Sequence, residues 1–220
     1  MAAHAPPMRK PRGRAPQELS LLKCTRPVLL ALILSLLAIA AGAGQQREEP
    51  LADSVRSALS AAVQARTPPK PVFRDAAHQA EFARWVQAMD VRLQRWVSSP
   101  LARQDLLQTV WYEAQRAALP PERVLGLIQV ESAFRKFAVS TAGARGLMQV
   151  MPFWADHIGD GHARALFELP VNVRFGCTIL RHYLDVERGD WVMALGRYNG
   201  SRGQHAYPRA VLSASEAWRP

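Results

Sequence analysis

The stretch that decides the fold is Pro120–Pro152, which reads PPERVLGLIQVESAFRKFAVSTAGARGLMQVMP. Pro121 suits the first turn of a helix, where its missing N–H is not needed, and Glu122 suits the positive end of the helix dipole. A helix is therefore predicted to begin here. Small residues with two glycines follow. They predict a loop, because glycine permits positive φ and close backbone approach. The apolar run 147–154 then predicts a second helix, which Pro152 ends or kinks.

One carboxylate lies on the apolar face of the first predicted helix. The buried stripe has the i, i+3, i+4, i+7 spacing, and its members are Val124, Leu127, Ile128 and Glu131. Burial and the negative end of the dipole both disfavour a charged carboxylate, so Glu131 is predicted to stay protonated, as a general acid must be. The alternative is an ordinary ion pair, since Arg135 lies four residues on.

The net charge of the chain limits the kinds of partner that it is expected to bind. The 220 residues carry a formal net charge of +10, and half of it comes from the six basic residues and one acid before residue 28. The mildly basic remainder suits an anionic polymer such as nucleic acid, an anionic membrane surface or a cell-wall glycan. Because no basic stripe interleaved with aromatic residues occurs, nucleic acid is not expected as a partner.

The N-terminal part of the chain predicts export. Residues 1–27 are rich in Pro, Arg and Ala and predict a disordered basic head. The uncharged apolar run in residues 28–44 predicts a signal peptide or an inner-membrane anchor, with the basic side cytoplasmic. Both remain open, because Ala41-Gly42-Ala43 fits a cleavage site while the run is nearly long enough to span a bilayer. Residues 45–73 predict a linker that ends in a proline cluster. The expected compartment is the periplasm.

The rest of the chain predicts an all-α fold. Residues 74–100 predict an amphipathic helix, from Asp75 to Val97, that packs on the domain of residues 101–215. In that domain, further helices are predicted from Leu101 to Ala118, Asn172 to Asp185 and Trp191 to Tyr198, with one more turn at Pro208–Leu212. No strand pattern of useful length occurs. Cys177 falls on an apolar helical face and is predicted to be a core residue.

No metal site, cofactor or serine-hydrolase nucleophile is predicted. The six histidines form no H-E-x-x-H motif and have no cysteine partner at metal spacing, and no G-x-S-x-G or phosphate-binding glycine loop occurs. No other carboxylate lies between Glu131 and Asp156, so the second acid of a two-carboxylate glycosidase is not evident nearby. A lone acid still suits glycan cleavage if the substrate supplies its own nucleophile.

Three short motifs occur together in the predicted domain. They are Glu131-Ser132, then G-A-x-G-L-M-Q-x-M-P at Gly143–Pro152, then Tyr198-Asn199. Their joint occurrence and spacing, over roughly Leu101 to Leu212, resemble the lysozyme-like lytic transglycosylases of bacterial cell walls (the SLT-domain family). The resemblance implies cleavage of the β-1,4 bond between N-acetylmuramic acid and N-acetylglucosamine, with formation of a 1,6-anhydro ring instead of attack by water.

The same resemblance implies roles for single residues. Glu131 would be the sole acid and base. Ser132 would contact an N-acetyl group. Tyr198 would hydrogen-bond Glu131 or the substrate, and Asn199 would help to hold this part of the site in place. The walls of the cleft would be Gly146, Leu147, Met148 and Gln149. Two arginines depart from the family pattern, Arg197 and Arg202, and could pair with carboxylates of the stem peptides.

Other functions fit the same residues. One is a goose-lysozyme-like hydrolase, in which water attacks. Another is a catalytically silent wall-binding or scaffold module in a secretion or division assembly. A third is a membrane-anchored adaptor that uses the helix of residues 75–97. The implied partners are peptidoglycan strands and, if the segment is uncleaved, the inner membrane through residues 28–44.

Overall fold

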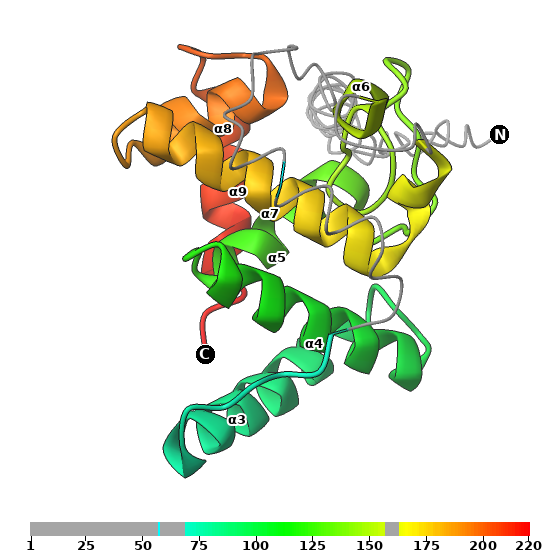
Figure 1. Ribbon diagram of the computed structural model, residues 1–220, viewed down its shortest axis with the longest axis vertical. Helices are drawn as coiled ribbons and strands as arrows, with labels where there is room; N and C mark the ends of the chain where they lie inside the picture. The colour runs from blue at the N-terminus through cyan, green and yellow to red at the C-terminus, as the bar shows by residue number, and fades with distance from the viewer. Residues whose placement is uncertain (1–56, 58–68, 157–162) are drawn as a thin grey trace, which may run out of the picture. The chain divides into compact units, whose positions relative to one another are not determined.

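The computed structural model describes residue 57, residues 69–156 and residues 163–220, all within one compact unit (Figure 1). The predicted head and apolar segment, residues 1–44, lie outside the described residues, as does nearly all of the predicted linker. No helix in the described part of the chain has both the length and the hydropathy needed to cross a bilayer.

The described residues form helices and connecting turns. In chain order the elements are α3 (Ala76–Leu93), α4 (Pro100–Arg116), α5 (Pro121–Ser132), α6 (Pro152–Asp156), the 3-10 helix η1 (Ala163–Phe167), α7 (Leu169–Val186), α8 (Trp191–Asn199) and α9 (Ala206–Glu216). Pairing between extended residues is limited, within these ranges, to two isolated bridges, Val139 with Arg145 and Arg145 with Val150. The prediction of an all-α fold is therefore confirmed for the described residues.

The helix ends follow local chemistry. The side chain of Asp75 accepts a hydrogen bond from His78 N (2.8 Å) at the start of α3, and that of Asp190 accepts from two backbone N–H groups at the start of α8. These bonds pair N–H groups that have no partner within the helix. At the end of α8, Gly200 adopts φ +82°, the left-handed conformation that favours glycine.

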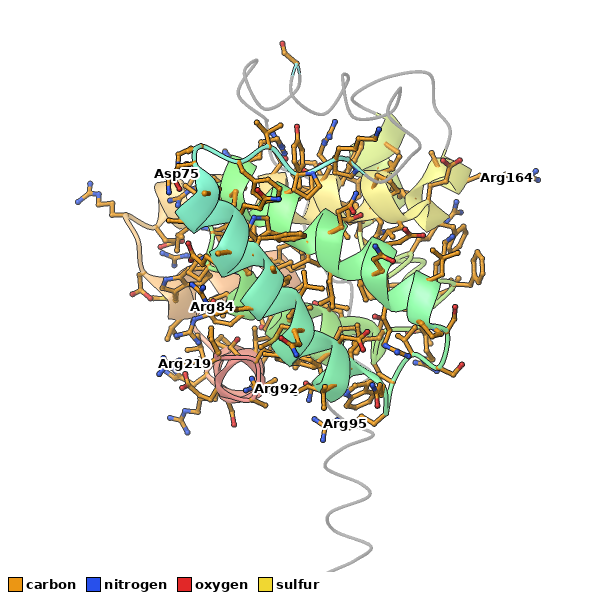
Figure 2. All side chains as sticks on the ribbon, turned by 90° about the horizontal axis from the view of Figure 1, so that it is seen from below. Asp75, Arg84, Arg92, Arg95, Arg164 and Arg219 are labelled. Carbon is orange, nitrogen blue, oxygen red and sulfur yellow. The ribbon has the colours of Figure 1, made fainter. Side chains whose placement is uncertain are left out.

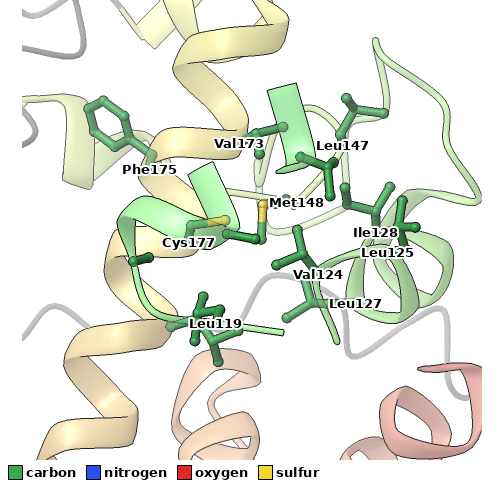
Figure 3. Close-up of a cluster of buried hydrophobic side chains, with 14 of the residues drawn as sticks. Leu119, Val124, Leu125, Leu127, Ile128, Leu147, Met148, Val173, Phe175 and Cys177 are labelled. Carbon is green, nitrogen blue, oxygen red and sulfur yellow. The ribbon is translucent and has the colours of Figure 1, made fainter. Parts of the chain in front are cut away.

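Helices α5 and α7 make the main helix-to-helix contacts around the site. Helix α5 packs most extensively against α9 and also contacts α4, while α7 packs against α4 and α8. The predicted stripe Val124, Leu127 and Ile128 is fully buried, and Figure 3 shows these side chains in one cluster with Met148 and Cys177. Cys177 is a buried free thiol, so its assignment to the core is confirmed.

Three details differ from the sequence-based expectation. The first helix ends at Leu93 and does not reach Val97. Residues 147–150 form a turn instead of a helix, because Arg145 and Val150 exchange backbone hydrogen bonds (2.9 and 3.0 Å), and Pro152 begins α6. The single turn expected at 208–212 is an 11-residue helix, α9, which packs along α5.

Candidate active site

Glu131 lies in the last turn of α5, and its side chain is buried, with 6% of the residue exposed. The hydroxyl of Tyr207, on α9, donates a hydrogen bond to Glu131 Oε1 at 2.5 Å. Glu131 Oε2 is buried and has no hydrogen-bond partner. Desolvation raises the pKa of Glu131 to about 8, although the bond from Tyr207 acts in the opposite direction. The carboxyl group is therefore neutral at pH 7.

The neutral state assigns the two oxygens of Glu131 different roles. Oε1 accepts from Tyr207 and is the carbonyl oxygen, so the proton lies on Oε2. Burial also raises the pKa of Tyr207 well above its ordinary value, and the neighbouring carboxyl adds to this effect. Tyr207 therefore stays a hydrogen-bond donor. The site holds a carboxylic acid whose proton-bearing oxygen is not committed to a protein group.

The ion pair between Glu131 and Arg135, considered as an alternative, does not form. Helix α5 ends at Ser132, and both Ala133 (φ +49°) and Phe134 (φ +60°) are left-handed. The i, i+4 geometry of a helix is therefore lost before residue 135, and Arg135 Nε donates to Ser132 O at 3.0 Å. Two consecutive non-glycine residues at positive φ are strained, and such strain is common at functional sites.

A cluster of aromatic side chains packs around this strained segment. The ring of Phe134 lies between Trp96 and Trp218, with centroid distances of 5.7 and 5.3 Å. Trp218 Nε1 donates to Gln129 Oε1 in α5 at 2.8 Å, which ties the end of the chain to the helix that carries Glu131. From α3, Arg92 donates to Ala217 O at 3.1 Å and also to Arg219 O. Figure 2 shows Arg92 and Arg219 together beside α9.

Asn172, in the first turn of α7, organises the loop that follows the strained segment. Its side-chain amide donates to Arg145 O (2.9 Å) and Leu166 O (2.7 Å), and its carbonyl oxygen accepts from Met148 N (2.8 Å). Gly146 has φ +77°, and a Cβ there would lie 2.3 Å from Asn172 Nδ2. Gly146 is therefore required for both its conformation and this close packing.

The predicted cleft walls are buried in this structure. The side chain of Met148 packs on Gly176 of α7, where a Cβ would meet the sulfur at 2.4 Å. Gln149 Nε2 donates to Gly146 O (2.9 Å) and Ala138 O (3.2 Å), inside its own loop. Leu147 is a core residue as well. The structure thus assigns these side chains to packing and loop closure, and their contact with substrate stays a prediction.

The structure differs from the prediction in which tyrosine contacts Glu131. Tyr198 and Asn199 are buried at the end of α8, and Tyr198 Oη donates to Met148 O at 2.7 Å, so this tyrosine supports the loop. The tyrosine that reaches Glu131 is Tyr207. Ser132 is also buried, and its hydroxyl donates to Ile128 O within α5 at 3.1 Å. The sequence motifs do not include Tyr207, although Tyr207, Val211 and Ser215 have the i, i+4 spacing of one helix face.

Two arginines and one pocket of the described residues do not join the candidate site. Arg197 and Arg202, expected to meet stem-peptide carboxylates, both pair with Glu187; the Arg202 Nε–Glu187 Oε1 distance is 2.6 Å. The described residues hold no group of three His, Cys, Asp or Glu side chains that could bind a metal ion. A pocket of about 360 Å³ is lined by His78, Trp111 and Arg116 among others, and it contains none of the predicted site residues.

Comparison with known proteins finds similarity in the part of the chain that carries Glu131 and Tyr207. Residues 108–216 match the model of the Transglycosylase SLT domain. This part of the chain, just under half of it, is therefore similar to the Transglycosylase SLT domain.

Individual proteins are similar to parts of this chain. A transglycosylase of Enterobacteria phage PRD1 is 36% identical over 114 residues, which is 46% of this chain and 42% of the phage protein. Membrane-bound lytic murein transglycosylase C of Actinobacillus pleuropneumoniae is 54% identical over 39 residues, 18% of this chain and 11% of that protein. The chain thus spans less than half the length of these relatives. The solved structure of an inactive mutant of lytic transglycosylase Slt from Pseudomonas aeruginosa aligns with TM-score 0.48 and 17% identity, covering 90% of this chain and 44% of that one.

Proposed function

We propose that this protein is a peptidoglycan lytic transglycosylase with Glu131 as its sole acid and base. The observation that carries the proposal is a neutral, buried carboxyl in the part of the chain similar to the SLT domain, with one oxygen held by Tyr207 and the other without a partner. A general acid needs a pKa near or above the working pH and a proton-bearing atom that can reach the leaving group. Glu131 meets the first condition, and no protein group holds its Oε2 away from the leaving group.

In the proposed first step, Glu131 Oε2 gives its proton to the glycosidic oxygen. The bond from C1 of N-acetylmuramic acid to that oxygen breaks, and N-acetylglucosamine leaves with a free 4-hydroxyl. Positive charge develops at C1, next to the carboxylate that has just formed. Because Tyr207 donates to Oε1, it stabilises this carboxylate without supplying a charge of its own.

In the second step, the Glu131 carboxylate takes the proton of the muramoyl 6-hydroxyl, and O6 forms a bond to C1. The 1,6-anhydro ring closes, no water is consumed, and Glu131 is protonated again. Burial disfavours the carboxylate form of Glu131. The same desolvation therefore keeps Glu131 protonated before the first step and favours its reprotonation in the second. One acid is sufficient because the substrate carries the nucleophile.

The test is the mass of the products released from purified peptidoglycan. Anhydro ends, which are one water lighter than reducing ends, are the expected result. Reducing ends would instead indicate the goose-lysozyme-like hydrolase. Glu131→Gln keeps the shape and removes the acidic proton, so the rate of release should fall by about 10²–10⁴-fold. If Glu131→Gln releases product at the parent rate, Glu131 is not the acid of the reaction. If the parent itself binds peptidoglycan and releases no product, the protein is a wall-binding module.

We further propose that the enzyme works in the periplasm on peptidoglycan strands, either free or anchored through residues 28–44. The partial identity to a protein named membrane-bound lytic murein transglycosylase C supports this location. Fractionation of cells that express the full chain, with an alkaline wash of the membranes, separates the free form from the anchored form.

A further inference from the structure

Two phenylalanines form an exposed aromatic pair beside the loop that follows Glu131. Phe137 lies in that loop and is 71% exposed, and its ring centroid is 6.0 Å from that of Phe167, the last residue of η1. Val139 in the same loop is 61% exposed. Single exposed apolar residues are common, but apolar side chains gathered from two separate segments mark a binding surface.

Two cations flank this pair. Lys136 Nζ lies 5.4 Å from the ring centroid of Phe137, and Arg145 Cζ lies 5.7 Å from that of Phe167. Among the described residues, no carboxylate lies within ion-pair distance of Lys136 or Arg145, whereas Arg197 and Arg202 share Glu187. The positive charge of the cluster is therefore available to an external anion.

The cluster of Lys136, Phe137, Arg145 and Phe167 is built on a braced backbone. Gly146 N donates to Ala138 O at 2.9 Å, and Val139 pairs with Arg145 in an isolated bridge. The Asn172 amide joins the two halves, since it donates to the carbonyls of Arg145 and Leu166. A ligand would therefore meet a surface that is already arranged, which lowers the entropy lost on binding.

The cluster is also close to Glu131 along the chain. Phe137 lies six positions after Glu131, so the two Cα atoms are at most about 22 Å apart. A polymer that presents a bond to Glu131 can thus reach the cluster with a neighbouring unit. This proximity favours the substrate over a membrane surface as the occupant.

We propose that Lys136, Phe137, Arg145 and Phe167 form a subsite that binds a carboxylate-bearing sugar unit of the glycan strand. The aromatic faces would contact the apolar face of the sugar ring, and the two cations would bind its carboxylates. Those carboxylates have two sources, the stem peptide and, on strands without peptides, the lactyl group of muramic acid. The subsite rests on the proposed function, because it assumes that the strand reaches Glu131.

The experiment measures binding of Glu131→Gln protein to insoluble peptidoglycan by sedimentation, and product release by the corresponding proteins with Glu131 intact. The variants are Phe137→Ala and the double variant Lys136→Ser with Arg145→Ser. The matched control is Arg95→Gln, since Arg95 lies 5.4 Å from the ring of Trp96 on another part of the surface; Arg95 is labelled in Figure 2. Thermal unfolding of every variant confirms that it is folded.

The expected result is a rise of about fivefold to tenfold in the apparent Kd and KM for Phe137→Ala and for the double variant, with kcat within about twofold and Arg95→Gln at the parent value. Blocking the carboxylates of the peptidoglycan as neutral amides should abolish the difference between the double variant and the parent. Enzymatic removal of the stem peptides then identifies the source: a difference that persists assigns the lactyl group, and one that disappears assigns the peptide.

Two outcomes would overturn the subsite. Parent-like Kd and KM in both variants, while the parent releases product, would remove the subsite and leave the proposed function intact. Sedimentation with phosphatidylglycerol vesicles that Phe137→Ala abolishes, without any change toward peptidoglycan, would assign the cluster to a membrane surface. Failure of the parent to bind or cleave peptidoglycan would instead contradict the proposed function itself.

Discussion

Glu113 and Glu131 are glutamates buried on successive helices, and their surroundings differ in kind. Glu113, on α4, is fully buried and accepts from Arg116 Nε and Arg174 Nε, each at 2.7 Å, so it joins α4 to α7 as a charged group. Glu131 has one neutral donor, Tyr207, and one oxygen without a partner. The comparison teaches that burial alone does not make an acid catalytic. The partners decide whether a buried carboxyl stabilises the fold or keeps a proton for chemistry.

The largest expected effect is a difference in stability between variants of the two glutamates. Glu113→Gln leaves the mostly buried guanidinium of Arg174 without its charged partner, so the free energy of unfolding should fall by about 3–5 kcal/mol. Glu131→Gln should show no such loss at pH 7, because its carboxyl is already neutral. Urea unfolding of both variants measures the difference. Equal stabilities of Glu113→Gln and the parent would contradict the structural role of the Arg116–Glu113–Arg174 cluster.

The second prediction concerns pH. The pKa of Glu131 is about 8 in the folded chain and near 4.5 in the unfolded chain, so between these values only the unfolded state releases the proton. The stability that comes from this difference is fully present below pH 4.5 and is lost as pH rises toward 8, at up to about 1.4 kcal/mol per pH unit. Unfolding curves of the parent and Glu131→Gln from pH 5 to 9 measure it. Parallel curves would show that the carboxyl is ionised in the fold.

The third prediction removes the donor to Glu131. Tyr207→Phe deletes the hydroxyl, and because this hydrogen bond lowers the pKa of Glu131, the pKa should rise further. Stability should fall by about 1–1.5 kcal/mol at pH 7, and the alkaline limb of the pH–rate profile should move to higher pH. Tyr198→Phe is the matched control, since Tyr198 donates to the backbone of Met148. An alkaline limb that moves in Tyr198→Phe and stays in Tyr207→Phe would reverse the assignment of the two tyrosines.

The smallest effect is expected at a third glutamate, the residue that follows the last turn of α7. Hydrogen bonding to Arg202, and then to Arg197, lowers the pKa of Glu187 to about 2, so its contribution to stability is present above pH 4.5 and is lost as pH falls toward 2. The side chain of Arg202 is 48% exposed, so Arg202→Ala should cost no more than about 1 kcal/mol at pH 7. The stability of Arg202→Ala should also change less than that of the parent between pH 5 and 3. A larger acid-induced loss in the variant would contradict this linkage.

Much of the site was predictable because its signals are local. The spacing of Val124, Leu127 and Ile128 predicted the buried face that carries Glu131, and the family motifs predicted the loop around Gly146. Tyr207 was not predictable in the same way, because it meets Glu131 across 76 residues of chain. The spacing of Glu113 with its neighbours also resembles that of Glu131, since both lie on an apolar helix face with an arginine three or four residues on.

The sequence by itself determined most of the long helices and the burial of Glu131, because these depend on contacts within a few residues. Only the tertiary structure decided which groups surround the buried carboxyl, and therefore its charge state. Arg135 is directed to a backbone carbonyl because α5 ends at Ser132, while α7 supplies Arg174 to Glu113 and α9 supplies Tyr207 to Glu131. The charge state of a buried carboxyl depends on the groups that surround it in space, and helical spacing does not contain that information.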